Sequence, residues 1–99
     1  MNWHGVRDVM KIYNYQGRAN IIGERLRVAR ERRRLSQDAV AARMQVEGVS
    51  LSQKAVSRIE KGKRFVADYE LLIFSQILSV NSYWLLTGEG DSRPHSPEV

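Results

Sequence analysis

The stretch 36–62, SQDAVAARMQVEGVSLSQKAVSRIEKG, contains two short helix patterns that follow one another closely. Ser36 is a favoured N-cap residue, because its hydroxyl can accept a hydrogen bond from a free amide of the first helical turn. The helix after it would bury Val40, Ala41 and Met44, which share one helical face. Gly48 then interrupts the pattern, so this first helix is expected to be short.

The second helix of this stretch has two candidate starts. Ser50 has capping-box spacing to Gln53, whereas Ser52 would give a shorter helix, and the sequence leaves both open. Gly62 marks the end of the helix, because glycine readily takes the left-handed conformation that follows a helix C-terminus. The helix is therefore expected to end at about Lys61.

Three further helices are predicted around this pair. One begins after Asn20, which can cap it, one begins at about Asp68, and a short one spans residues 82–87. Their inward-facing residues recur at helical spacing. In chain order these residues are Ile22, Leu26 and Ala29, then Leu71, Phe74, Ser75 and Leu78, and finally Trp84 and Leu85. The expected fold class is an all-α five-helix bundle.

The chain divides into three parts. Residues 1–19 are expected to form an N-terminal arm or an extra short helix, residues 20–88 the domain, and residues 89–99 a disordered tail that holds both prolines. Four apolar residues of the arm have the spacing of an amphipathic helix that would pack on the core or on a partner subunit, and a frayed extension is the alternative. These four residues are Val6, Val9, Met10 and Tyr13.

Composition argues against an enzyme. The 99-residue chain, with 42% hydrophobic residues, has room for one small core but not for a deep catalytic cleft as well. It has no cysteine, and its two histidines, His4 and His95, lie near the termini. No nucleophile, acid/base pair or metal-ligand cluster is visible. We therefore expect no catalysis, no metal, no cofactor and no small-molecule substrate.

The sequence also gives no sign of a membrane segment. No apolar run approaches the length of about 18 residues that spans a bilayer. The N-terminus lacks the apolar core of a signal peptide. The expectation is a cytoplasmic protein that does not bind membranes.

The charges are unevenly distributed along the chain, whose formal net charge is +5. Residues 18–64 carry thirteen Lys and Arg against five Asp and Glu, whereas residues 65–99 carry one Arg against five Asp and Glu. Segregation of this kind indicates a side that faces a polyanion. A basic surface that is merely solvated remains the alternative.

The helix predicted before Gly62 has two unlike faces. Val56 and Ile59 would anchor it to the core. The opposite face is polar, and a glutamine there can pair bidentately with adenine, as an arginine or lysine can with guanine. An ordinary solvent-exposed helix would carry similar residues. The candidate base-reading residues are Gln53, Lys54, Ser57 and Arg58.

Residues around this helix are suited to phosphate groups. Backbone amides and the helix dipole at the start of the helix after Ser36 favour an anion, and basic side chains near Gly62 could flank the reading helix. Phosphate contacts would fix the register while the helix reads bases. The candidate phosphate contacts are Ser36, Gln37, Arg43, Ser52, Lys61, Lys63 and Arg64. Two short helices joined by a glycine-containing turn match a helix-turn-helix layout.

Four motifs, in order, carry a resemblance to a known family. They are Ile22-Gly23-Glu24-Arg25-Leu26-Arg27 with Arg30, Leu35-Ser36-Gln37, Ser57-Arg58-Ile59-Glu60-Lys61-Gly62-Lys63, and Trp84-Leu85-Leu86-Thr87-Gly88-Glu89. From about residue 21 to 90 the chain resembles the Cro/repressor-type (XRE-like) helix-turn-helix domain. The resemblance implies a lambda-repressor-like bundle and a homodimer on a pseudo-palindromic double-stranded DNA operator. It also implies a sequence-specific transcriptional regulator, expected to be a repressor.

The resemblance also assigns roles to individual residues. Gln37 would hold a phosphate, and Gln53, Lys54 and Arg58 would occupy the family's base-reading positions. Arg30 and Glu60 would form the family's ion pair between the first and third helices. One departure is a turn between Met44 and Ser52 that is longer than the family's tightest. The second helix is expected to continue through Val46, with residues 47–51 as the turn.

The last predicted helix and its surroundings are more apolar than a small monomer requires. Val80, Tyr83, Trp84 and Leu86 are therefore candidates for a dimer interface, although Trp84 also suits the core. A rival function is an antitoxin-like or coregulatory module that uses the same fold to hold a protein partner. The aromatic residues Trp3, Tyr13 and Tyr15 of the arm would suit that function.

Overall fold

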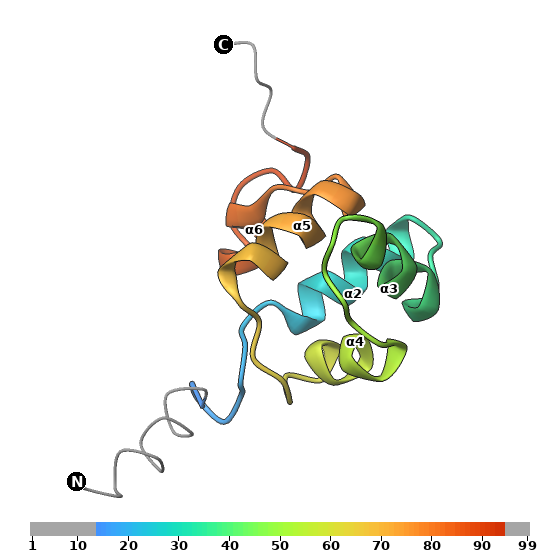
Figure 1. The fold of residues 1–99 in the computed structure, drawn as a ribbon. Coiled ribbons are helices and arrows are strands. Elements are labelled where there is room, and N and C mark those ends of the chain that lie inside the picture. The colour runs from blue at the N-terminus through green and yellow to red at the C-terminus, as the bar shows by residue number, and fades with distance from the viewer. Residues whose placement is uncertain (1–13, 95–99) are drawn as a thin grey trace, which may run out of the picture.

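The computed structural model describes residues 14–94, and within that range it contains five α-helices and no extended strand (Figure 1). The helices are α2 (Gly23–Arg32), α3 (Gln37–Val46), α4 (Gln53–Glu60), α5 (Asp68–Leu78) and α6 (Ser82–Thr87). This confirms the predicted all-α bundle. The apolar stripe predicted in the arm, Val6, Val9, Met10 and Tyr13, lies outside the described residues. Over residues 14–94, no helix has both the length and the apolar character needed to cross a membrane.

Serine caps fix the starts of α3 and α4. Ser36 Oγ accepts a hydrogen bond from the Ala39 amide at 3.0 Å, which confirms the predicted cap of α3. Ser52 Oγ accepts from the Ala55 amide at 3.0 Å, so Ser52 rather than Ser50 begins α4. The two helices are therefore short, as the sequence indicates.

Asn20, at the start of the domain, bonds both to the first residues of α2 and to the chain around the end of α4. Its Oδ1 accepts hydrogen bonds from the amides of Ile22 and Gly23 at 3.0 and 2.8 Å, which satisfies free donors at the start of α2. Its Nδ2 donates to the carbonyls of Ile59 and Arg64 at 2.9 and 2.8 Å. The N-cap position of α2 is occupied by Ile22 rather than by Asn20 as predicted, and Asn20, two residues earlier, links the start of α2 to the end of α4.

The core lies where α2, α3, α4 and α5 meet, and α6 closes it from the side of α5. The predicted inward residues Ile22, Leu26 and Ala29 are almost fully buried, as are Phe74 and Leu78 of α5. Leu85 brings α6 into the interior with no exposed surface. Helical periodicity alone therefore identified most of the core.

The long turn between α3 and α4 is anchored by apolar side chains. α3 ends at Val46, as predicted, and Gly48 takes a left-handed conformation with φ of 86°. Leu51 is buried and Val49 is half-buried against the core. Each side chain that leaves water in this turn contributes to holding α4 in place. The longer turn is therefore a packed segment.

Two arginines of the basic stretch hold helices together through hydrogen bonds to backbone carbonyls. Arg25 donates to the carbonyls of Leu85 and Leu86 at 2.8 and 3.1 Å, and Arg33 donates to the Leu78 carbonyl at 3.0 Å. These carbonyls belong to the last turns of α6 and α5, where basic side chains satisfy unpaired acceptors. Part of the positive charge in α2 is thus used to hold α5 and α6 against it.

Ser92, in the described part of the predicted tail, is bonded to the domain. The Asn81 amide donates to the Ser92 carbonyl at 2.9 Å, and Arg32 Nη1 donates to Ser92 Oγ at 3.3 Å. The Arg32 guanidinium also lies 5.5 Å from the ring centre of Trp84, within cation–π range. No local pattern of residues indicates these contacts. Residues 95–99 lie outside the described range.

Candidate nucleic-acid interface

The outer face of α4 is open to solvent. Gln53, Lys54 and Arg58 are exposed and Ser57 is half-buried, so the four candidate base-reading residues lie on one accessible face. On the opposite face, Val56 and Ile59 are completely buried. The apolar side chains of α4 are packed in the core, and its polar side chains are accessible to a ligand from solvent.

A buried ion pair joins α2 to the end of α4. Arg30 Nε lies 2.6 Å from Glu60 Oε2, and Arg30 Nη2 lies 3.0 Å from Glu60 Oε1, which is a bidentate arrangement. The two side chains are only 12% and 4% exposed. The hydrogen bond to Glu60 raises the pKa of the Arg30 guanidinium above its ordinary value. Arg30 Nη1 also donates to the Leu35 carbonyl at 2.9 Å, which places the start of α3.

This ion pair continues as a chain of hydrogen bonds to the reading face. Gln37 Nε2 donates to Glu60 Oε1 at 2.9 Å, and Gln53 Nε2 donates to Gln37 Oε1 at 2.7 Å. The chain therefore runs from α2 through both ends of α4 and the start of α3. The Gln53 amide uses one of its two N–H donors in this chain and keeps its second N–H and its carbonyl oxygen for another partner.

The candidate phosphate residues fall into two groups. Ser36, Gln37, Ser52, Lys61 and Lys63 surround α4, and the two lysines are exposed at its C-terminal end. Arg43 instead borders a hollow with Val46, Glu47 and Ile77, on the side of α3 that meets α5. Arg64 is mostly buried and holds Glu70 at 3.0 Å, and Glu70 in turn accepts from the Ala67 amide at the start of α5. Arg43 and Arg64 are therefore placed apart from the α4 face.

One basic residue near α4 was missed by the sequence reasoning. Arg27 borders a hollow of about 270 Å³ together with Arg30, Gln37, Ser57, Glu60 and Lys61. Arg27 is exposed, and its partner Glu31 at 3.2 Å is exposed as well. A surface pair of this kind is weak, so the guanidinium remains available to an anion. Its three-residue spacing from Arg30 was the only signal in the sequence.

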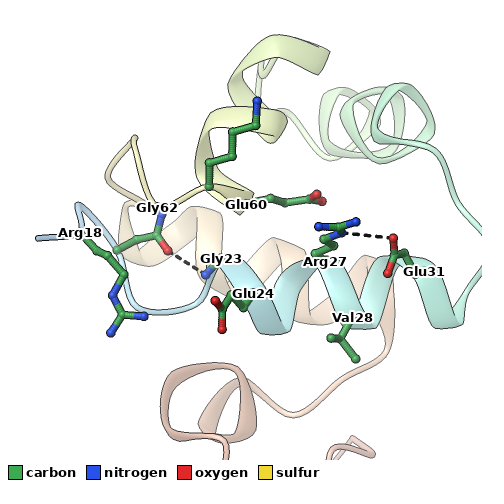
Figure 2. A pocket seen from close by; sticks show the side chains of 10 residues that line it. Arg18, Gly23, Glu24, Arg27, Val28, Glu31, Glu60 and Gly62 are labelled. Carbon is green, nitrogen blue, oxygen red and sulfur yellow. Dashed lines mark hydrogen bonds and ion pairs between the residues drawn. The ribbon is translucent and has the colours of Figure 1, made fainter.

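A larger hollow, of about 570 Å³, runs along the exposed side of α2 beside the end of α4. Figure 2 shows Arg18 and Glu24 near its one end, and Arg27 beside Glu31 further along α2. Acidic and basic side chains alternate there, so this hollow has no dominant charge for a polyanion. Nor do the residues from 14 to 94 include a group of His, Asp or Glu side chains placed to hold a metal ion.

The candidate dimer residues differ in exposure. Tyr83 and Leu86 are 58% and 37% exposed, whereas Val80 and Trp84 are half-buried against the core. On the neighbouring helix α5, Tyr69 is also largely exposed. α5 and α6 therefore both carry exposed aromatic or apolar side chains.

Comparison with known proteins agrees with this geometry. A model of the helix-turn-helix domain family matches residues 21–78, which is more than half of the chain. Among solved structures, the P22 c2 repressor protein in complex with synthetic operator 9T is similar, with 30% identity over 71% of this chain and 98% of that chain and a TM-score of 0.57. No curated protein matches the chain. The shared helices and the extent of both matches show that the chain belongs to the helix-turn-helix family, in its Cro/repressor-type branch.

Proposed function

We propose that the protein is a sequence-specific DNA-binding transcriptional regulator, expected to act as a repressor, that reads the major groove as a homodimer with the outer face of α4. The observation that carries this proposal is the solvent-exposed polar face of α4, whose residue Gln53 is joined to the core by the hydrogen-bond chain that runs through Gln37 and Glu60 to Arg30. The major groove is wide enough to admit one α-helix. The similarity to a repressor that is described in complex with its operator supports the same function.

Base reading is assigned to the start and centre of α4. Bidentate pairing with adenine requires one donor and one acceptor on the same amide, and Gln53 retains both beyond its bond to Gln37. Lys54 and Arg58 are exposed on the same face and suit guanine. Ser57 lies between them and can bond to either kind of base edge.

Phosphate contact is assigned to the residues around α4. Gln37 and Ser36 lie at the N-terminus of α3, where the dipole favours an anion, and Ser52 lies at the corresponding place on α4. Lys61 and Lys63 supply positive charge at the other end of α4, and Arg27 is added to this group. Arg64 is left out because its side chain pairs with Glu70 of α5, and Arg43 because it borders a hollow with Ile77 of α5 rather than with α4.

The proposal is tested by selection from a random double-stranded DNA library, with binding of the recovered site measured at two salt concentrations. Recovery of a palindrome with short half-sites, bound with steep salt dependence, is the expected result, because phosphate contacts release counterions. Sequence-indifferent binding would contradict major-groove reading by α4. Absence of any binding would favour the rival protein-interaction module.

Arg58→Ala is expected to weaken binding to the recovered site by about 1–3 kcal/mol and to relax the preference at one base pair. Lys63→Ala is the matched control, since it removes a charge but keeps the backbone carbonyl that accepts from Arg58 Nη2 at 3.2 Å. That variant should weaken all sequences alike and reduce the salt slope by about one. Titrations on cognate and scrambled duplexes separate the two effects, and identical behaviour would contradict the division into readers and phosphate contacts.

The homodimer is assigned to α6 and its surroundings, with Tyr83 and Leu86 as the exposed apolar residues and Val80 and Trp84 behind them. Light scattering on the DNA-free chain is expected to give a mass that rises toward two chains with concentration. Tyr83→Glu should return the mass to one chain, because a charge would be buried in the interface. A single-chain mass at high concentration in the unaltered protein would count against a preformed dimer.

A further inference from the structure

A basic hollow of about 400 Å³ lies between the ends of α2 and α5 and the described part of the tail. Three guanidinium groups border it, from Arg32 and Arg33 at the end of α2 and from Arg93. The other residues around it are Ala29, Leu78, Ser79, Val80 and Ser92, so none of the described residues that border it is acidic. Its volume falls within the range of about 300–1,000 Å³ that small-molecule sites occupy.

Arg32 and Arg33 already have contacts that favour one orientation of each side chain. Arg33 Nε donates to the Leu78 carbonyl at 3.0 Å, which leaves its two terminal nitrogens for another acceptor. The Arg32 guanidinium lies 5.5 Å from the ring centre of Trp84, and its Nη1 donates to Ser92 Oγ at 3.3 Å. Side chains that are ordered before a ligand arrives lose less conformational entropy when it binds.

Arg93 binds a carboxylate at the edge of this hollow. Its Nε donates to Asp91 Oδ2 at 2.8 Å. The two side chains are 84% and 54% exposed, and an exposed ion pair of this kind contributes little to stability. A doubly charged anion that also contacts Arg32 and Arg33 can therefore compete with the Asp91 carboxylate.

The remaining walls suit a ligand with a small body. Ala29 and Leu78 are almost fully buried and Val80 is half-buried, so the deeper part of the hollow is apolar. Ser79 and Ser92 add hydroxyl groups, which can donate hydrogen bonds to an oxyanion. The arrangement therefore fits a compact anionic group attached to a small organic molecule.

The hollow is remote from the proposed reading face. In Figure 1, α4 and residues 89–94 lie on opposite sides of the domain. A ligand in the hollow would therefore leave the outer face of α4 accessible. It would join the end of α2 to the end of α5 and to Ser92, whose carbonyl accepts from the Asn81 amide just before α6.

We propose that this hollow is a binding site for a small phosphate monoester, whose phosphate group is held by Arg32, Arg33 and Arg93. The planar guanidinium fork matches the geometry of phosphate oxygens and forms charge-assisted hydrogen bonds with them. A phosphate monoester carries about two negative charges at neutral pH, which suits three converging arginines. This inference does not depend on DNA binding.

Titration of the isotope-labelled full chain with phenyl phosphate, at constant ionic strength, tests the proposal. The amide signals of Ser79, Val80 and Ser92 are expected to shift and to saturate, with a Kd below about 1 mM. The amides of Lys61 and Lys63 report phosphate bound near α4 and should shift less. Absence of saturable shifts at Ser79, Val80 and Ser92 would overturn the proposal.

Matched variants separate this site from a general effect of charge. Arg32→Gln should weaken binding about tenfold or more, because charge-assisted hydrogen bonds are lost. Arg18→Gln removes the same charge beside the opposite end of α2 and should change the affinity less than about twofold, since distant surface charges are screened. Arg93→Gln alters a side chain that is 84% exposed, so it should weaken binding in a folded chain. Equal effects of Arg32→Gln and Arg18→Gln would overturn the proposal.

The same titration with dimethyl phosphate identifies the source of the phosphate group. This diester carries one negative charge, as each phosphate of a nucleic-acid backbone does. It should bind about tenfold more weakly than phenyl phosphate, because less charge faces the three arginines. Equal affinities would assign the hollow to a nucleic-acid backbone and overturn the assignment to a small monoester.

Discussion

Glu60→Ala is expected to lower the free energy of unfolding by about 3–5 kcal/mol, because removal of one partner leaves the other charge buried and uncompensated. The Arg30 side chain is only 12% exposed, and its guanidinium would keep only the Leu35 carbonyl as acceptor. Gln37 would lose its acceptor as well, and with it the fixed position of Gln53. Urea unfolding followed by circular dichroism measures the loss, which is a large part of the stability of a small domain.

Two further variants show whether burial is the cause. Glu31→Ala breaks the pair with Arg27, whose side chains are 63% and 53% exposed, and should change stability by about 0–1 kcal/mol. Arg30→Met combined with Glu60→Leu removes both charges together and should recover much of the loss, since apolar residues of similar size can replace a buried pair. A Glu60→Ala cost no larger than that of Glu31→Ala would contradict a structural role for the network.

Gly23→Ala is expected to destabilise the domain by about 1–3 kcal/mol through overpacking. A Cβ at this position would lie 2.4 Å from the Ile59 carbonyl oxygen and 2.8 Å from the Glu60 carbonyl oxygen. Both are backbone atoms at the end of α4, so neither can move aside without shifting the helix. Because α4 carries the reading face, the same change should also weaken binding to the DNA site selected from the library.

The sign of the stability change in Gly23→Ala shows which of two effects is larger: the clash of the new Cβ with α4, or the restriction of the unfolded chain. Gly23 is the first residue of α2 and does not have a positive φ. Alanine at a compatible glycine position usually stabilises a protein by about 0.4–1 kcal/mol, because it restricts the unfolded chain. Thermal and urea unfolding of the variant both measure the sign. A gain in stability would show that α2 and α4 can separate at no cost.

Local patterns in the sequence determined where most elements begin and which faces are buried. Ser36 and Asn20 indicate nearby helix starts, because each has a side-chain acceptor for the free amides of the next turn. Gly62 indicates a helix end. The apolar spacing of Leu26, Ala29 and their counterparts identified the core. The polar outer face of α4 followed from the same periodicity. These features depend on residues a few positions apart, which a sequence displays directly.

Tertiary structure decided between residues that look alike in the sequence. The choice of Ser52 over Ser50 places Leu51 in the core just before α4, which capping preference alone does not specify. The arginines of α2 and of its C-cap look alike in the sequence, yet Arg25 and Arg33 bond to carbonyls of helices far along the chain, whereas Arg27 borders a hollow beside α4.

Tertiary structure also decided the positions of two candidate phosphate residues and the need for glycine at position 23. Arg64 is held by Glu70, and Arg43 borders a hollow with Ile77 of α5, and neither position could be inferred from the charge of the residue. Gly23 has no room for a Cβ atom, because carbonyl groups more than thirty residues away in the chain lie against it. A long basic side chain bonds to whichever carbonyl or carboxylate the packed helices bring within reach. That distance depends on how the helices are arranged in three dimensions, which the local pattern of residues does not encode.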